Sequence, residues 1–427
     1  MKTQLRMVGC RLNQSEIDAM ARQLSALGHE IVDSAAEADH FILNTCAVTS
    51  EAAKTSRKLI RDFHRANPKG ETTVTGCYAQ LAPQEIGRLP GVRRVVDNAG
   101  KSQLVSQITG EGIDIFDSEP LEREAPFGRT RAFVKVQDGC DQACTFCVTT
   151  IARGAGRSRP ISEVLREVTY LQAAGYQEIV LTGVHLGSYG HDQGERAGLS
   201  QLVRALLRDT DMPRIRLSSL EPWDLAPGFF SLWGDRRLCR HLHLPLQSGC
   251  DRTLKRMRRH TSRRQFRDLL ASARASIPAL RLTTDVIVGF PGETDEEFDE
   301  SERFIREMDF AGLHVFRYSS RPGTPASRMR NQVSDGDKKA RSGRLRALSR
   351  RMEARFAADL CGTEGEVLWE QVDGATPRGF TISGYTDNYM RVRCVHPRDL
   401  TNTITATQLG AYTDGAIHGT VKEVLPR

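Results

Sequence analysis

The sequence has no apolar run long enough to cross a membrane. A membrane-spanning helix needs about 20 consecutive apolar residues, and no stretch of the 427 residues approaches that length. The first residues, MKTQLRMVGCRLNQ, also lack the basic and then apolar pattern of a secretory signal and its small-residue cleavage site. We therefore expect a cytoplasmic protein that is not associated with a membrane.

Internal repeats and low-complexity tracts are also missing from the sequence. The chain is 39% hydrophobic and 26% charged, which are ordinary values for a globular protein with sizeable cores. Its 427 residues exceed the roughly 100–200 of one compact domain. We expect two or three domains.

Disulfides are not expected, because a cytosolic chain keeps its ten cysteines reduced. Clustered cysteines in such a chain are typical of metal ligands or reactive groups. Four of them lie in or near apolar segments and are expected to be buried, inert thiols: Cys239, Cys250, Cys361 and Cys394. The other six follow a different pattern.

The first hundred residues alternate between strand and helix patterns. Three short apolar, β-branched runs are LRMVG, HFILNT and TTVTG. Helical periodicity covers residues 13–27, 49–65 and 82–89. This order predicts an α/β domain over residues 1–120, in which helices cover the faces of a parallel sheet.

The alternation begins again near Arg131, where six further strand-like runs follow with helical patterns between them. The runs are AFVKVQ, EIVLTG, RIRLSS, HLHLPL, LTTDVIVG and GLHVFRYS. Six such units suit a partial (β/α)6 barrel better than a complete eight-unit barrel. The Pro/Gly-rich segment 319–327 ends the pattern, and we place the second domain at residues 126–357.

Positive charge is concentrated at the end of this second domain. Residues 321–357 contain 11 Lys and Arg against 3 Asp and Glu, and residues 338–356 have the pattern of a basic helix. Beyond Gly362, five short runs alternate apolar and polar residues, with Gly, Asp and Pro turns between them. This texture predicts a small antiparallel β-barrel over residues 358–427.

The strongest chemical signal is CDQACTFC, a CxxxCxxC motif formed by Cys140, Cys144 and Cys147 directly after a predicted strand. Iron–sulfur clusters are held by cysteine thiolates, and these short spacings let one loop wrap a cluster. Three ligands for a four-iron cluster leave one iron open to another ligand. Structural zinc sites have four ligands, usually in CxxC pairs, so the spacing argues against zinc.

Cys10, Cys46 and Cys77 are far apart in sequence, but each directly follows a predicted strand. The carboxyl ends of parallel strands lie along one edge of a sheet, where α/β sheets gather ligands. The three thiols could therefore converge on a second cluster, again with an open iron. The alternative, three buried cysteines at strand ends, stays open on the residues alone.

The CxxxCxxC motif, with Phe146 before its last cysteine and a barrel behind it, resembles the radical S-adenosylmethionine (SAM) superfamily. The resemblance implies that SAM binds the open iron and is cleaved by one electron to a 5′-deoxyadenosyl radical. It also implies SAM contacts for Phe146, for Gly183 in LTGVHLGSYG, for Glu221 in SSLEP, and for DVIVGFPGET (285–294). Each of these later segments could equally be a plain strand-to-helix turn.

Motifs along nearly the whole chain resemble the methylthiotransferase family. They include VGCRLNQSE (8–16), NTCAVTSEA (44–52), VTGCYAQ (74–80), ARGAGRSR (152–159) and HLHLPLQSG (241–249). The likeness is to the MtaB-type subgroup, and it implies that a methylthio group is added to C2 of N6-threonylcarbamoyladenosine beside the anticodon of tRNA. One departure is Val148-Thr149-Thr150, where many relatives have a proline.

The same resemblance implies the cofactors and partners. Two 4Fe–4S clusters are implied, a radical SAM cluster at Cys140, Cys144 and Cys147 and an auxiliary cluster at Cys10, Cys46 and Cys77 that holds or delivers the sulfur. SAM is implied both as the radical source and as the methyl donor. A reducing partner such as flavodoxin or ferredoxin is implied as well.

Contacts to tRNA are expected in two places. Phosphate contacts dominate the affinity of proteins for nucleic acids, and the predicted basic helix offers Arg344, Arg346, Arg350, Arg351 and Arg355. A solvated helix face is the alternative interpretation. The C-terminal barrel resembles a TRAM domain, an RNA-binding module, and its candidate contacts are Phe380, Tyr385, Tyr389 and Arg391. Those aromatic residues could equally belong to its core.

Three other functions remain possible at this point. The substrate could be isopentenyl-adenosine in tRNA or an aspartate of a ribosomal protein, although the N-terminal motifs and the basic helix favour the first reading. A chain that supplied every metal ligand itself could instead be a non-catalytic iron–sulfur RNA-binding protein.

Overall fold

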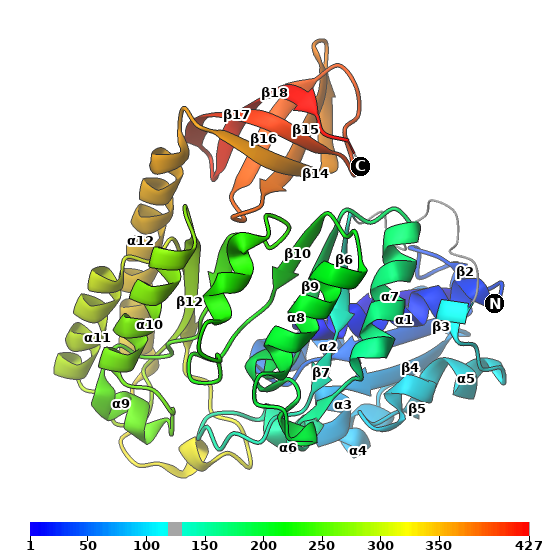
Figure 1. The fold of residues 1–427 in the computed structure, drawn as a ribbon. Helices are drawn as coiled ribbons and strands as arrows, with labels where there is room; N and C mark the ends of the chain where they lie inside the picture. The colour runs from blue at the N-terminus through cyan, green and yellow to red at the C-terminus, as the bar shows by residue number, and fades with distance from the viewer. Residues whose placement is uncertain (118–129, 427) are drawn as a thin grey trace.

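The computed structural model describes residues 1–117 and 130–426, and it confirms the predicted α/β class (Figure 1). An N-terminal sheet with its helices lies beside a central barrel, and a small β-barrel lies at one end of the central barrel. The predicted boundary between the first two domains, at residues 120–126, lies outside the described residues. None of the helices in the described ranges is long and apolar enough to cross a bilayer.

The N-terminal part is a five-stranded sheet in the order β2-β1-β3-β4-β5, with every neighbouring pair parallel. Its strands are β1 (Lys2–Met7), β2 (Glu30–Ile31), β3 (His40–Thr45), β4 (Glu71–Gly76) and β5 (Val92–Val95). Its helices are α1 (Arg11–Ala26), α2 (Ser50–Ala66), α3 (Cys77–Leu81), α4 (Pro83–Gly87) and α5 (Leu104–Thr109). The three strands that the sequence predicted, β1, β3 and β4, form the centre of this sheet.

Burial explains which strands the sequence revealed. The central strand β3 is buried at all six positions and reads as a continuous apolar run. The edge strand β5 has the sequence VRRV and exposes both arginines, so it carries no clear strand pattern. Helix α2 begins where Thr49 accepts a hydrogen bond from the backbone N–H of Ala52, at 3.2 Å.

The central part contains six parallel strands in sequence order. The first sheet holds β6 (Arg131–Lys135), β9 (Glu178–Thr182) and β10 (Arg214–Leu217), and the second holds β11 (His241–His243), β12 (Arg281–Val288) and β13 (Leu313–Arg317). Parallel bridges from Ile215 to Leu238 and from Ser219 to His243 join the two sheets. The predicted partial (β/α)6 barrel is confirmed.

Helices cover the outside of this barrel. They are α7 (Ile161–Ala173), α8 (Gly198–Asp209), α9 (Asp251–Arg256), α10 (Arg263–Ser276) and α11 (Asp295–Met308). The strands β10 and β11 are connected through a short 3-10 helix, Phe229–Gly234. Near the CxxxCxxC motif lie the paired strands β7 (Gln137–Asp138) and β8 (Arg157–Ser158) and the helix α6 (Thr149–Arg153).

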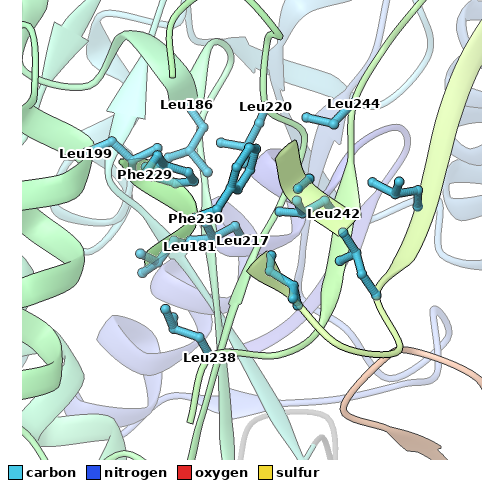
Figure 2. Packing of buried hydrophobic residues seen from close by; sticks show 14 of the residues in the cluster. Leu181, Leu186, Leu199, Leu217, Leu220, Phe229, Phe230, Leu238, Leu242 and Leu244 are labelled. Atoms are coloured by element: carbon cyan, nitrogen blue, oxygen red, sulfur yellow. The ribbon is translucent and has the colours of Figure 1, made fainter. Parts of the chain in front are cut away.

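The main core lies between the barrel strands and these outer helices (Figure 2). Leu181, Leu217 and Leu242, from three successive strands, pack in one cluster with Phe229 and Phe230 of the 3-10 helix. Each such buried side chain contributes about 1.5–3 kcal/mol. Strand residues alternate between faces, so the neighbours of these leucines point into the barrel.

The C-terminal part is a closed five-stranded barrel in the order β14-β15-β16-β18-β17. Its strands are β14 (Glu364–Thr376), β15 (Gly379–Thr386), β16 (Arg391–His396), β17 (Ile404–Thr413) and β18 (Ala416–Val424). The fully buried Trp369 fills its centre and donates from Nε1 to Thr405 Oγ1 at 2.8 Å. The basic helix α12 (Asp335–Leu360) leads into it, so the predicted boundary at residues 357 and 358 falls in the last turn of that helix.

The C-terminal barrel covers the amino-terminal ends of the central strands. Glu178, the first residue of β9, is fully buried between Arg214 at 2.9 Å and Arg216 at 2.7 Å. Burial alone would raise the pKa of Glu178, but Arg216 and Arg214 lower it to about 2. Arg214 also donates to the Tyr385 carbonyl oxygen and Arg216 to that of Asp387. The opposite end of the barrel is left for the cysteine loops.

Three of the four cysteines expected to be inert are buried: Cys239, Cys250 and Cys394. The expectation is wrong for Cys361, which is exposed at the end of α12. Its thiol donates to the Gly410 carbonyl oxygen at 2.9 Å. The helix ends there, so the apolar stripe that buries its other residues no longer covers this side chain.

Candidate active site between two cysteine groups

The first cysteine group lies at the carboxyl ends of three neighbouring strands. Cys10 follows β1, Cys46 follows β3, and Cys77 follows β4 as the first residue of α3. Because these strands are adjacent and parallel, the three residues reach the same edge of the sheet. Asn13 of α1 donates to the Thr45 carbonyl oxygen at 3.1 Å, which fastens α1 to the end of β3.

Two glycines allow the loops of this group to approach each other. Gly9 has a φ of +119°, and a Cβ at this position would lie 2.6 Å from the Cβ of Cys46. Gly76 has a φ of +96°, and its Cβ would lie 2.4 Å from the Thr45 carbonyl oxygen. Only glycine tolerates both the backbone angle and the lack of space.

The three thiols are close enough to affect one another's ionisation. Burial raises the pKa of the Cys46 thiol to about 11, and the nearby Cys10 and Cys77 add to the rise, against the backbone N–H of Val48 at 3.4 Å. Thiolates held together in this way are stabilised by a bound metal centre, whose ligands must be deprotonated. The donor set therefore fits an iron–sulfur cluster.

The CxxxCxxC loop lies at the carboxyl end of the barrel strand β6, between β7 and β8. Its entry is tightly folded, because a Cβ on Gly139 would lie 1.8 Å from the Ala155 carbonyl oxygen. The backbone N–H of Cys140 donates to the Gly154 carbonyl oxygen at 3.0 Å. The loop is thus closed against the segment that follows α6.

Backbone and arginine N–H groups point at the sulfur atoms of this loop. The N–H of Gln142 lies 3.4 Å from Cys140 Sγ, and that of Thr149 lies 3.3 Å from Cys147 Sγ. Burial raises the pKa of the Cys144 thiol, and Cys147 and Cys140 add to it, whereas Arg259 opposes the rise from 3.7 Å. N–H groups of this kind stabilise thiolates around an iron–sulfur cluster.

One buried arginine connects the two cysteine groups. Arg153 ends α6, the short helix that follows Cys147, and only 4% of its surface is exposed. Its Nε donates to Cys77 Sγ at 3.3 Å, and its Nη2 donates to Asn13 Oδ1 at 2.9 Å. A residue from the CxxxCxxC segment therefore bonds directly to a sulfur of the other group.

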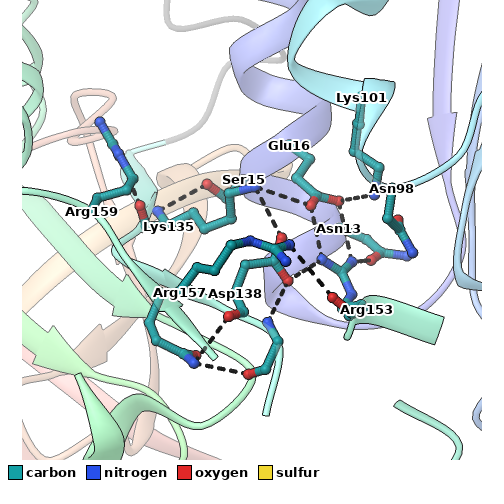
Figure 3. Close-up of polar contacts among 12 residues, drawn as sticks. Asn13, Ser15, Glu16, Asn98, Lys101, Lys135, Asp138, Arg153, Arg157 and Arg159 are labelled. Carbon is teal, nitrogen blue, oxygen red and sulfur yellow. Dashed lines mark hydrogen bonds and ion pairs between the residues drawn. The ribbon is translucent and has the colours of Figure 1, made fainter. Parts of the chain in front are cut away.

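Glu16 of α1 balances the charge of this arginine (Figure 3). Its buried carboxylate lies 3.0 Å from Arg153, 2.7 Å from Lys101 and 3.4 Å from Lys135. Burial alone would raise the pKa of Glu16, but Lys101 and Arg153 hold it well below its usual range. The partners come from both the N-terminal domain and the barrel, so this ionic network fixes the two cysteine groups relative to each other.

His185 contacts the first cysteine of the motif from the turn after β9. Its Nδ1 lies 3.4 Å from Cys140 Sγ, and its Nε2 lies 2.5 Å from Asp224 Oδ2. Its backbone N–H donates to Gln137 Oε1 at 2.9 Å. The imidazole is therefore held in one orientation beside the motif.

The three residues predicted to contact SAM surround the same loop. Phe146 lies within it and lines a pocket described below. Gly183 follows β9, where a Cβ would lie 2.9 Å from Gln137 Oε1. Glu221 follows β10, and its buried Oε2 has no hydrogen-bond partner among the described residues. Their role toward SAM stays a prediction.

A pocket of about 190 Å³ opens between the loops of the two cysteine groups. Val48 and Thr49, which follow Cys46, line it from the N-terminal domain, and Cys147 lines it from the motif. Asp285 and Phe316 line it from the inside of the barrel. A small group bound here would touch the surroundings of both cysteine groups at once.

Known proteins share this combination of parts. Residues 2–97 match the family model described as Uncharacterized protein family UPF0004, and residues 134–305 match that of the Radical SAM superfamily. The chain is 40% identical to the threonylcarbamoyladenosine tRNA methylthiotransferase MtaB of Bacillus subtilis, over 90% of this chain and 88% of that protein. The chain belongs to the methylthiotransferase family.

Other relatives and solved structures agree with this membership. MtaB of Thermotoga maritima is 36% identical over 90% of this chain and 89% of its own. The tRNA-2-methylthio-N(6)-dimethylallyladenosine synthase of Oceanobacillus iheyensis is 32% identical over 98% and 84%. The radical SAM methyltransferase TsrM of Kitasatospora setae has a similar fold, with a TM-score of 0.57 at 16% identity over 88% of this chain and 79% of that one. The radical SAM match implies SAM and one 4Fe–4S cluster as cofactors.

In this methylthiotransferase the arginines of α12 fall into two sets. Arg344 pairs with Asp299 at 2.8 Å, and Arg355 pairs with Asp309 at 3.0 Å. The other three arginines are exposed and form no ion pair with any described residue: Arg346, Arg350 and Arg351. Only this second set is free to meet phosphates, and the contact itself stays a prediction.

The predicted RNA contacts of the C-terminal barrel lie in different surroundings. Tyr389 packs against the central barrel, with the guanidinium of Arg216 4.6 Å from its ring centre, and Tyr385 stacks on Tyr389 at 4.9 Å. Phe380 is half-buried against the small core, and Arg391 lies 3.7 Å from Asp373. Both tyrosines are thus part of the contact between domains, and the roles of Phe380 and Arg391 stay predictions.

Sequence reasoning did not single out several residues that the structure brings to the site. Arg153, Glu16 and His185 each lie inside a quoted motif, but no spacing rule pairs them with a cysteine from another segment. The same holds for His243 and Gln247 within HLHLPLQSG. Their polar side chains at strand and loop positions were the available signal.

Proposed function

We propose that this protein is a threonylcarbamoyladenosine tRNA methylthiotransferase, which adds a methylthio group to C2 of N6-threonylcarbamoyladenosine next to the anticodon. The observation that carries the proposal is the 40% identity to a protein of that name over 90% of the chain. The geometry supports it, because two cysteine groups face one pocket of about 190 Å³. Sulfur transfer to a carbon that a radical activates requires such a meeting point.

The cluster ligands follow from the two groups. Cys140, Cys144 and Cys147 would hold the radical SAM cluster, and Cys10, Cys46 and Cys77 would hold an auxiliary 4Fe–4S cluster. When bound, the first cluster with SAM supplies the radical that activates C2, and the second supplies the sulfur. Three protein ligands on each cluster leave one iron for SAM or for the sulfur species.

The residues of the chain hold these parts in place. Arg153 donates to Cys77 Sγ from the segment that also carries Cys147, which fixes the distance between the two cluster loops. His185, oriented by Asp224, restrains Cys140. Phe146, Gly183 and Glu221 surround the position proposed for SAM. Their shared task is orientation and the exclusion of water, since the cofactor carries the chemistry.

The proposed partners follow from the reaction. The substrate is tRNA, and the exposed arginines of α12 are the proposed phosphate contacts. The reductive cleavage of SAM needs an electron donor such as flavodoxin or ferredoxin. A tRNA substrate also favours a cytoplasmic location.

The alternatives receive less support. The relative named for dimethylallyladenosine is 32% identical, against 40% and 36% for two relatives named for threonylcarbamoyladenosine. A ribosomal-protein aspartate as substrate and a purely iron–sulfur RNA-binding role have no counterpart among these relatives.

Nucleoside mass spectrometry of tRNA from cells that lack this protein tests the proposal. We expect 2-methylthio-N6-threonylcarbamoyladenosine to disappear and its precursor to accumulate, with both restored by the native gene. A C140A variant should fail to restore the product, although the protein is present. If the methylthio group is lost from isopentenyl-adenosine instead, or if tRNA nucleosides do not change, the proposed substrate is wrong.

A further inference from the structure

The pocket between the cysteine groups continues into the barrel as a set of polar side chains. Asp285 of β12 lines the pocket. Its Oδ1 lies 3.0 Å from His243 Nε2 and 3.3 Å from His314 Nδ1, so one carboxylate joins histidines from the strands on both sides. The two imidazole rings stack with centres 5.0 Å apart. All three residues point into the barrel, away from its hydrophobic core.

One end of this polar set is fixed and the other is accessible. His243 is buried, and its Nδ1 lies 2.9 Å from Thr283 Oγ1. The side chain of His314 is 62% exposed, and its Nδ1 already faces Asp285. Its remaining ring nitrogen, Nε2, has no hydrogen-bond partner among the described residues and can meet a ligand in the pocket.

Gln247 supplies an unpaired amide to the same pocket. Only 9% of this residue is exposed, and its Oε1 is buried without a hydrogen-bond partner in the described parts of the chain. Its backbone has a φ of +70°, which is uncommon for a residue with a side chain. The backbone bonds to Asp285 at 2.8 Å and from Ile287 at 2.9 Å hold it there. Buried polar atoms normally have partners, so this amide is suited to a ligand.

Apolar side chains surround the mouth of this pocket. Phe316 is 44% exposed and Val48 is 53% exposed, and both line it. Exposed large apolar side chains that gather at one site mark a binding surface. Aromatic rings in this position stack on unpaired nucleobases.

We propose that this pocket is a subsite for the N6 substituent of the substrate adenosine, with Gln247, Asp285 and His314 as specificity-determining residues. The inference rests on the proposed function. The adenine stacks on Phe316, and the polar residues meet a substituent that carries a ureido group, a hydroxyl and a carboxylate. The Gln247 amide pairs with the ureido group, Asp285 accepts from its N–H or from the hydroxyl, and His314 donates to the carboxylate.

The chemistry of the pocket selects against an apolar substituent. A dimethylallyl group would leave the Gln247 amide and the Asp285 carboxylate buried beside carbon atoms. Sites that are built to hydrogen-bond a ligand discriminate strongly against analogues that lack the bonding groups, because the protein groups are then left unpaired. The polar subsite therefore explains a preference for threonylcarbamoyladenosine.

Binding of anticodon stem-loop RNAs to the reconstituted enzyme tests this subsite. Three RNAs differ only in the base next to the anticodon: adenosine, N6-threonylcarbamoyladenosine and N6-isopentenyl-adenosine. Fluorescence anisotropy under anaerobic conditions gives the affinity of each. We expect the native enzyme to prefer the threonylcarbamoyl RNA at least tenfold over the other two.

Two variants remove the polar contacts with little risk to folding. H314L changes an exposed side chain, and Q247N keeps an amide that tolerates the left-handed backbone but shortens its reach. We expect each to reduce the tenfold preference to threefold or less, while affinity for the unmodified RNA changes less than twofold. H418L, which alters an exposed histidine of the C-terminal barrel, is the matched control and should keep the full preference. An unchanged preference in both H314L and Q247N would overturn the subsite.

Failure of the subsite and failure of the proposed function give different results. If cells that lack the protein lose the methylthio group of threonylcarbamoyladenosine but both variants keep the native preference, only the subsite is wrong. If those cells lose the methylthio group of isopentenyl-adenosine and the native enzyme prefers the isopentenyl RNA, the proposed function falls and the subsite falls with it.

Discussion

At the scale of single residues, the account depends most on Arg153. This side chain is buried, begins in the segment of the CxxxCxxC motif and ends at the sulfur of Cys77, in a different domain. Glu16 compensates its charge from 3.0 Å. Hydrogen bonds and charge next to a cluster sulfur set the reduction potential of an iron–sulfur cluster. One residue thus controls both the spacing and the electronics of the site.

The Arg153→Met variant tests this role. Loss of a cationic N–H donor from Cys77 destabilises the reduced form of the auxiliary cluster. If the bond favours the reduced form by about 1.4 kcal/mol, the potential becomes more negative by about 59 mV. A redox titration followed by electron paramagnetic resonance measures the shift. R157M, at an exposed arginine nearby, should leave the potential unchanged, and an unshifted potential in R153M would contradict the role of this residue.

At the scale of elements, the site is produced by strands that end together. Cys10, Cys46 and Cys77 come from strands that are adjacent in the sheet, and the glycines before two of them let the loops fold closely. The same rule places the CxxxCxxC loop at the carboxyl end of β6. Local geometry at a glycine therefore decides whether the thiols converge.

Gly76 and Gly28 separate backbone strain from lack of space. Both have positive φ, +96° and +76°, but a Cβ on Gly76 would meet the Thr45 carbonyl oxygen at 2.4 Å, whereas Gly28 has nothing within 4 Å. We expect G28A to lose about 1 kcal/mol of stability from the backbone angle alone. G76A should lose clearly more and should also lose iron from the auxiliary site. Urea unfolding and iron analysis compare the two, and equal losses in both variants would count against the steric argument.

The sequence revealed these elements to different degrees. The central strands β3 and β4 and the helix α11 were predicted because each carries a strong apolar period. The edge strands β2 and β5 were missed, since two residues and an exposed VRRV leave no period to detect. The contact of Arg153 with Cys77 spans 76 positions, and no pattern in one sequence encodes such a pairing. Only the folded barrel brings them together.

At the scale of the whole molecule, α12 connects the two ends of the enzyme (Figure 1). Its first turns lie near the carboxyl end of the barrel strands, where Arg341 pairs with Glu293 at 2.6 Å. Its last turn enters the C-terminal barrel, which covers the opposite end. A bound tRNA that reaches the pocket and the C-terminal barrel would run along this helix.

The exposed arginines of α12 should therefore contribute to binding through phosphates. We expect R346Q/R350Q to weaken tRNA binding and to reduce the slope of log affinity against log salt by about one per lost contact. R344Q/R355Q removes the same formal charge from residues that are already paired with Asp299 and Asp309. This second pair should change the slope much less. Equal slopes for both double variants would assign the helix to a solvated face.

The most direct test of the account is the iron and sulfide content of anaerobically reconstituted protein. The native chain should hold about eight irons and eight sulfides, as two 4Fe–4S clusters. A variant with Cys10, Cys46 and Cys77 all changed to alanine should hold about four of each and should still show a spectral change on addition of SAM. A native content of about four, or a triple variant that keeps about eight, would contradict the claim that each cysteine group holds one cluster.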